Sequence, residues 1–151
     1  MFSIYVSSNS EYQAFLLEGN GISIHEIRQN TDKQVGTKES YFNAYIWAIQ
    51  AVSALFKYNK LPNDNLMCYL NNLTTQKWLT SVLDSNSRSS VPRKYFKYLH
   101  ELATCLNSLP VGYDLSFVEY NRAKQYATEK AYLAQKAENK PVKATDAFKS
   151  W

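Results

Sequence analysis

The chain has 151 residues, 45% of them hydrophobic and 20% charged, which is the size and composition of one globular domain. No apolar run approaches the roughly 20 residues of a membrane helix, and the first residues do not resemble a signal peptide, so we expect a cytoplasmic protein. The net charge of +4 permits a polyanionic partner without requiring one. The two cysteines, Cys68 and Cys105, form no metal-binding pattern, and neither a metal nor a cofactor is predicted.

The first third of the chain is predicted to form three antiparallel strands. Residues 2–7 and 12–18 are rich in β-branched and aromatic side chains, and residues 22–28 alternate apolar with polar positions. Gly19-Asn20-Gly21 separates the second strand from the third, because glycine and asparagine adopt the positive φ angles that tight hairpins need. A three-stranded meander is therefore expected at the start of the chain.

The rest of the chain is predicted to alternate helices with strands. In order, we expect a helix from Ser40 to about Asn59, a strand at 66–70, a helix at 74–83, a helix beginning at Pro92, a strand at 113–119 and a helix at 123–138. The strand at 66–70 is wholly apolar, which is typical of a strand covered on both faces. The order β-β-β-α-β-α-α-β-α predicts an α/β domain over residues 1–138, with a five-stranded mixed sheet and helices on both faces. Residues 139–151 are predicted to form a basic, flexible tail.

Several segments resemble the type-one ribonuclease H family in their order and spacing. They are Phe2–Ser10, Thr37–Asn43, Leu66–Asn72, Leu115–Tyr120 and Ala131–Ala134, which are similar to the first strand, the first helix, the fourth strand, the fifth strand and the last helix of that family. The resemblance spans about residues 2–137, although no motif of the family is intact. It implies the ribonuclease H fold.

In that family four carboxylates bind two divalent cations, which activate water for cleavage of a phosphodiester. The resemblance places the four carboxylates at uncharged residues, namely Ser7, Asn43, Asn71 and Ala131. It places the catalytic histidine of the family near Asn121. Hard divalent cations prefer ionised oxygen ligands, so we expect a pseudo-enzyme with no catalytic or metal-binding residues. An active ribonuclease H with relocated carboxylates, among them Glu39 and Glu119, remains the least favoured alternative.

Two segments are candidates for binding. Basic side chains at Arg88, Arg93, Lys94 and Lys97 lie between Asp84 and Glu101 without an intervening acid. In the family this region grips a hybrid duplex, so these residues are either phosphate contacts or an ordinary solvated helix face.

Phe148 and Trp151 are candidate anchors for a partner, unless the tail that carries them docks on its own domain. The predicted function is that of a non-catalytic adaptor or inhibitor acting through protein–protein contacts. The alternative is a non-cleaving binder of an RNA/DNA hybrid or duplex.

Overall fold

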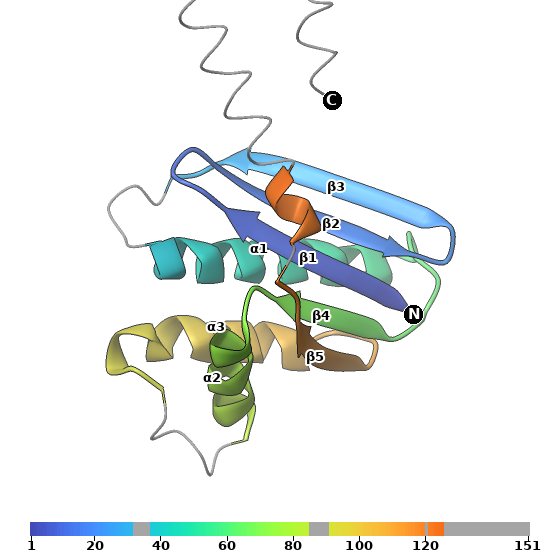
Figure 1. Cartoon of the computed structure of the whole chain (residues 1–151). Coiled ribbons are helices and arrows are strands. Elements are labelled where there is room, and N and C mark those ends of the chain that lie inside the picture. Colours follow the sequence, from blue (N-terminus) through green and yellow to red (C-terminus); the bar gives the residue numbers. More distant parts are fainter. Residues whose placement is uncertain (32–36, 85–90, 120, 126–151) are drawn as a thin grey trace, which may run out of the picture.

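The computed structural model describes residues 1–31, 37–84, 91–119 and 121–125. Its centre is a five-stranded sheet with the strand order β3-β2-β1-β4-β5 (Figure 1). The strands are β1 (Phe2–Ser8), β2 (Tyr12–Gly19), β3 (Ile22–Gln29), β4 (Leu66–Leu70) and β5 (Tyr113–Phe117). Strands β1, β2 and β3 form an antiparallel meander, whereas β4 runs parallel to β1 and β5 runs parallel to β4. The α/β class and the five-stranded mixed sheet are therefore confirmed.

The β2–β3 hairpin has the two-residue turn that its sequence predicts. Asn20 and Gly21 have φ angles of 52° and 73°, which is the backbone of a type I′ turn. Gly19 has a different role, because a Cβ atom built there would lie 2.5 Å from the carbonyl oxygen of Met1. The hairpin therefore packs too closely on the start of β1 to accept any other residue at position 19.

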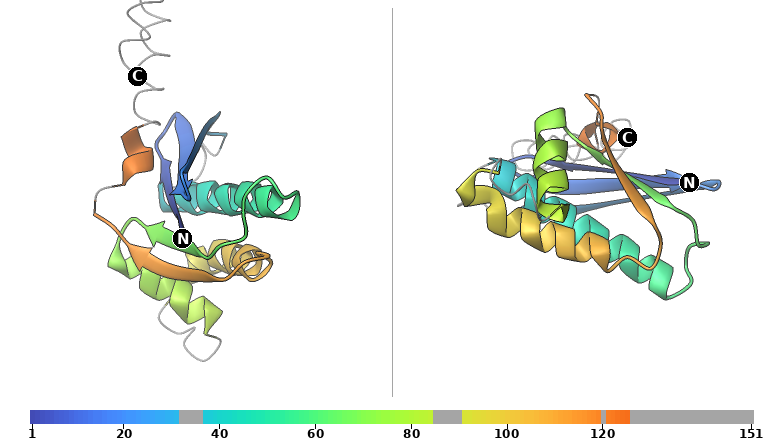
Figure 2. Two further views of the ribbon diagram at one scale, coloured as in Figure 1. Left: turned by 90° about the vertical axis from the view of Figure 1, so that its right-hand side faces the viewer. Right: turned by 90° about the horizontal axis from the view of Figure 1, so that it is seen from below.

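The longer helices cover one face of the sheet (Figure 2). They are α1 (Thr37–Lys57), α2 (Leu73–Leu83) and α3 (Phe96–Asn107), with the 3₁₀ turn η2 (Arg93–Tyr95) leading directly into α3. Their apolar faces bury one side of β1, β2 and β4, and the core includes Phe2, Ile4, Phe15, Tyr45 and Leu99. Residues 122–125 are helical and lie against the opposite face, where Ala123 is fully buried (Figures 1 and 2).

Three predicted boundaries or environments differ from the structure. Helix α1 begins at Thr37, so Ser40 lies inside its first turn, where its buried side chain accepts a hydrogen bond from Asn30. Strand β5 ends at Phe117 instead of residue 119. Strand β4 is not covered equally on both faces, since Met67 and Tyr69 remain partly exposed. Of the last predicted helix the structure describes only its start, and the predicted tail at 139–151 lies outside the described residues.

Candidate functional site

The candidate site lies where β1 and β4 end side by side. The parallel pairing of these strands runs from Phe2 opposite Leu66 to Ile4 opposite Cys68, and the same register, extended by three residues, puts position 7 level with position 71. Ser7 is buried with 6% of its surface exposed, and Asn71 is half-buried. Two of the positions that the resemblance selects are therefore neighbours, as expected where the carboxyl ends of parallel strands meet.

Asn121 links the ends of these two strands. Its side-chain amide Nδ2 donates one hydrogen bond to the backbone oxygen of Val6 and another to Oδ1 of Asn71. Its own Oδ1 accepts a hydrogen bond of 2.9 Å from the backbone N–H of Ala123, at the start of the 122–125 helical turn. Asn121 is 8% exposed, so these bonds form away from bulk water. We call Ser7, Asn71 and Asn121 the amide cluster.

Tyrosines of α1 support the amide cluster from the core side. The phenol oxygen of Tyr41 accepts a hydrogen bond of 3.1 Å from the backbone N–H of Asn71, and the phenol of Tyr45 donates one of 2.9 Å to the backbone oxygen of Tyr69. Burial raises the pKa of both phenols far above the ordinary value for tyrosine. Both side chains therefore stay neutral, and α1 fixes the backbone at the end of β4.

A second polar cluster anchors the first turn of α1 to the sheet. The hydroxyl oxygens of Ser8 and Ser40 lie 2.7 Å apart, and Asn30 Nδ2 donates to the Ser40 hydroxyl at 2.7 Å. Gln13 Nε2 donates to the backbone oxygen of Ser40 at 3.1 Å. Gln13, Asn30 and Ser40 are each at most 5% exposed. These bonds give the buried side chains of Gln13, Asn30 and Ser40 the hydrogen-bond partners that buried polar groups require.

The remaining predicted positions have different outcomes. Asn43 lies half-buried in the second turn of α1. Ala131 lies outside the described residues. Glu39 is in the first turn of α1 and Glu119 is exposed beyond β5. In the part of the chain that the structure describes, no three histidine, cysteine or acidic side chains come together as metal ligands.

The chemistry available to the amide cluster is that of neutral donors and acceptors. Amides neither gain nor lose a proton near neutral pH, so Asn71 and Asn121 cannot act as a general acid or base. Across the described residues, every buried side-chain nitrogen and oxygen has a hydrogen-bond partner. The cluster is thus a satisfied structural network that ties the segment after β5 to the ends of β1 and β4.

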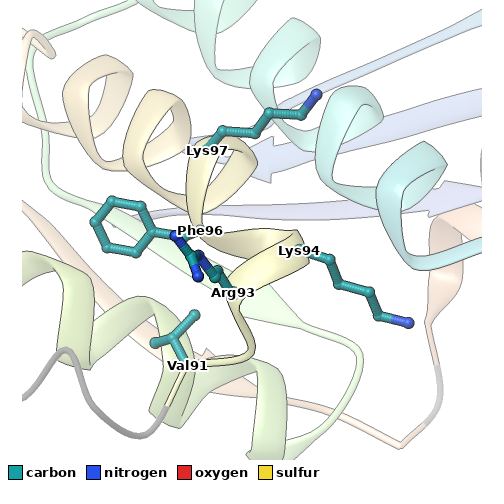
Figure 3. Close-up of a pocket in the computed structure, with 5 residues that line it drawn as sticks. All are labelled: Val91, Arg93, Lys94, Phe96 and Lys97. Atoms are coloured by element: carbon teal, nitrogen blue, oxygen red, sulfur yellow. The ribbon is translucent and has the colours of Figure 1, made fainter.

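Three of the four predicted basic residues line a shallow depression of about 600 Å³ (Figure 3). Its lining consists of Val91, Arg93, Lys94, Phe96 and Lys97, which we call the basic hollow. Figure 3 shows that the long side chains of Lys94 and Lys97 leave the backbone in different directions. Arg88 lies outside the described residues.

Lys38, which the sequence did not single out, adds a cation from α1 to the edge of the basic hollow. Its Nζ lies 4.7 Å from the ring centre of Trp78 and 6.0 Å from that of Tyr95. Nζ of Lys94 lies 4.9 Å from the same Tyr95 ring. None of Lys38, Arg93, Lys94 and Lys97 forms an ion pair with a described residue. Two ammonium groups therefore share one aromatic ring with no described carboxylate bonded to either.

Apolar side chains are exposed close to the amide cluster. Leu73, the first residue of α2, is 43% exposed, and Phe117, which pairs with Leu70, is 39% exposed. Leu73 follows Asn71 by two residues, and Phe117 is the last residue of β5. Leu73 and Phe117 therefore both lie at the end of the sheet where the amide cluster sits. We call Leu73 and Phe117 the apolar rim. The predicted anchors Phe148 and Trp151 lie outside the described residues.

Comparison of the sequence with protein-family models and with curated proteins finds no match. None of the described helices has both the length and the apolar character needed to cross a lipid bilayer.

Proposed function

We propose that the protein is a non-catalytic binding protein with a ribonuclease H-like fold, which acts as an adaptor or inhibitor through contacts with a protein partner. The observation that carries the proposal is the double hydrogen bond of Asn121. Its amide hydrogens point at the carbonyl oxygens of Val6 and Asn71, which are the kind of oxygens that a hard cation binds. In this chain the side-chain amide of Asn121 therefore donates hydrogen bonds to the oxygens that a cation could otherwise bind.

The apolar rim supports a protein as the partner. Leu73 and Phe117 expose apolar surface beside a neutral cluster, and burial of such surface is worth about 25 cal/mol per Å². A phosphate backbone gains little from neutral amides and apolar side chains, because its affinity comes mainly from Lys and Arg. A protein surface with apolar side chains of its own fits this end of the sheet better.

Affinity capture from a lysate of the source cells, with and without nuclease treatment, tests the proposal. We expect a protein partner that persists after nuclease treatment. The double variant Leu73→Ser/Phe117→Ser should lose it, whereas Tyr58→Ser should retain it, because Tyr58 is 76% exposed at a different site. Loss of the partner on nuclease treatment, or equal capture by both variants, would contradict the protein contact.

The non-catalytic part of the proposal has its own test. The purified chain should not cleave an RNA–DNA hybrid in magnesium or manganese above a buffer control. Cleavage that copurifies with the chain and disappears in Glu39→Gln or Glu119→Gln would establish relocated carboxylates and overturn this part. The two variants neutralise acids that lie outside the amide cluster without changing side-chain size.

The basic hollow favours a second candidate, which is binding of a nucleic-acid duplex or RNA/DNA hybrid without cleavage. Its cations have no described carboxylate partner, and phosphate contacts of this kind weaken with salt by a log–log slope of about 0.9 per contact on a B-form duplex. In a duplex-binding titration at several salt concentrations, Arg93→Ala/Lys94→Ala/Lys97→Ala should weaken binding and flatten the slope. The charge-matched control Lys57→Ala/Lys60→Ala/Lys124→Ala changes exposed lysines elsewhere. Equal weakening by both triple variants would mean that binding depends on the net charge of the protein and not on the basic hollow.

A further inference from the structure

The tip of the β2–β3 hairpin carries an asparagine that is followed by glycine. Asparagine is among the thermolabile side chains of proteins. Asn20 and Gly21 are both exposed, and a Cβ atom at Gly21 would meet no other atom within 4 Å. The backbone N–H of Gly21 lies outside the strand ladder, because Gly19 and Ile22 form its last pair. The nitrogen that follows Asn20 is therefore neither shielded by a side chain nor used in the sheet.

Asp64 holds the side chain of Asn20 from the connection between α1 and β4. Asn20 Nδ2 donates a hydrogen bond of 3.2 Å to Oδ2 of Asp64. Hydrogen bonds from the α-amine of Met1 and from Asn20 lower the pKa of Asp64 to about 2, so its carboxyl group is ionised near neutral pH. The contact therefore joins an amide to a carboxylate and restrains the amide in the folded hairpin.

We propose that Asn20 is a site of deamidation and that its contact with Asp64 slows the reaction. The backbone nitrogen of Gly21 loses its proton to solvent and forms a bond to Cγ of Asn20, while Nδ2 leaves as ammonia. Water then opens the resulting cyclic imide at either carbonyl carbon, which gives aspartate or isoaspartate at position 20. Because the hydrogen bond to Asp64 restrains the reacting side chain, a chain that lacks this bond should react faster. The inference does not rest on the proposed function.

Either product would disturb the tip of the hairpin. Aspartate at position 20 places a second carboxylate against Asp64, where the unmodified chain has an amide donor. Isoaspartate adds a methylene to the main chain between Gly19 and Ile22, whose pairing closes the hairpin. Gly19 has little room to move, because a Cβ atom there would already lie 2.5 Å from the carbonyl oxygen of Met1. The modification therefore loosens the contact between the hairpin and the α1–β4 connection.

Asn59 is an internal control for the reaction. It is also exposed, and its φ angle of 58° is close to the 52° of Asn20. The residue after it, however, is Lys60, whose backbone N–H donates to the Leu55 oxygen at 2.9 Å. The two asparagines thus share a backbone φ angle, whereas only Asn20 is followed by an unshielded nitrogen.

Peptide mapping by mass spectrometry, over days in a warm and mildly alkaline buffer, tests the site. We expect the peptide with Asn20 to convert to aspartate and isoaspartate several times faster than the peptide with Asn59. Asn20→Gly retains a residue that suits this turn and should abolish conversion in its peptide. Conversion at Asn20 no faster than at Asn59, or conversion that persists in Asn20→Gly, overturns the assignment.

Asp64→Ala tests the restraint. The variant removes the acceptor of the Asn20 amide, so conversion at Asn20 should accelerate while conversion at Asn59 stays unchanged. An unchanged rate at Asn20 would overturn the role of Asp64. Equal acceleration at both asparagines would overturn it as well, since it would mean that the connection between α1 and β4 has loosened as a whole.

An exchange of the two side chains tests the effect on the fold. Asn20→Asp imitates one product, and its melting temperature near pH 7 should lie below that of the wild type, because two carboxylates then oppose each other. In Asn20→Asp/Asp64→Asn the amide and the carboxylate exchange places, so the melting temperature should return toward that of the wild type. A single variant as stable as the wild type, or a double variant no more stable than the single one, overturns the proposed effect.

Discussion

The amide cluster and the basic hollow are polar regions of opposite character. In the amide cluster, Asn121 donates to two oxygens and its own oxygen accepts from Ala123, so donors and acceptors are matched. At the basic hollow, Lys94 of η2 shares the ring of Tyr95 with Lys38 of α1, and none of the cations there forms an ion pair with a described residue. The first region stabilises the fold, whereas the second leaves charge available for a ligand.

The comparison indicates where substitutions will change stability and where they will change binding. A buried donor that serves two acceptors cannot be removed without leaving both acceptors unpaired, and each unpaired buried group costs about 1–3 kcal/mol. An exposed lysine over an aromatic ring contributes about 0.5–1 kcal/mol at most, since water screens it. Changes in the amide cluster should therefore alter the free energy of unfolding, and changes in the basic hollow should not.

Asn121→Asp should have the largest effect, because it replaces the donor with a carboxylate that faces the oxygens of Val6 and Asn71. We expect a loss of about 3 kcal/mol in the free energy of unfolding near pH 7 by urea denaturation. Asn71→Asp is the matched control: its new carboxylate still accepts from Asn121, so we expect a loss of about 1 kcal/mol. Equal losses would show that the direction of the hydrogen bond is unimportant.

The loss in Asn121→Asp should depend on pH. Burial beside two oxygens raises the pKa of the new carboxyl in the folded state above its unfolded value of about 3.9. The protonated acid can still donate one hydrogen bond. The stability of the variant should therefore lie closest to that of the wild type below the unfolded-state pKa of about 3.9. The difference in stability should then grow as the pH rises through the folded-state pKa. A pH-independent difference would mean that the carboxylate reaches water.

Tyr41→Phe should have the next largest effect. It removes the oxygen that accepts from the backbone N–H of Asn71 and leaves that donor unpaired, which costs about 1–2 kcal/mol. Tyr45→Phe is the comparison, because it removes a donor from the Tyr69 carbonyl oxygen, an acceptor with two lone pairs. Thermal melting should rank Tyr41→Phe as the more destabilised variant. The reverse order would place the main support for the end of β4 at Tyr45.

The sequence predicted the elements of the fold better than it predicted the site. The alternation of apolar and polar residues at 22–28 follows from the local geometry of a strand, so the strand could be predicted directly from the sequence. The start of α1 was wrong because Ser40 is typical of a helix cap, while its actual partners come from β1, β2 and the residue after β3. Tertiary contacts took priority over the local signal.

The contacts of the site depend on residues far apart in the chain. Asn71 and Asn121 are separated by 50 positions, and the sequence marks Asn121 only through the resemblance, as the place of a missing histidine. Lys38 joins Lys94 at the Tyr95 ring only because α1 packs beside η2 and α2. Neither pair follows a periodic pattern. Such convergence needs the sheet order and the helix packing, which a single sequence does not specify.

Replacement of Arg93, Lys94 and Lys97 with alanine should change stability by no more than about 0.5 kcal/mol, because the three side chains lie on the surface. The measurement is urea denaturation of the triple variant beside the Lys57/Lys60/Lys124 control. A loss as large as that expected for Tyr41→Phe would show that the basic hollow is part of the folding energetics. The contrast between the two regions would then fail.

Magnesium should have the smallest effect of all. A ligand stabilises the folded state only by binding it, and the amide cluster offers neutral oxygens that already accept from Asn121. Millimolar magnesium should therefore leave the melting temperature of the wild type unchanged at constant ionic strength. Asn121→Asp sharpens the test, since it places a carboxylate beside the oxygens of Val6 and Asn71, the hard ligands that magnesium prefers. A rise in melting temperature with magnesium in Asn121→Asp, but not in the wild type, would identify the amide of Asn121 as the group that takes the place of a cation.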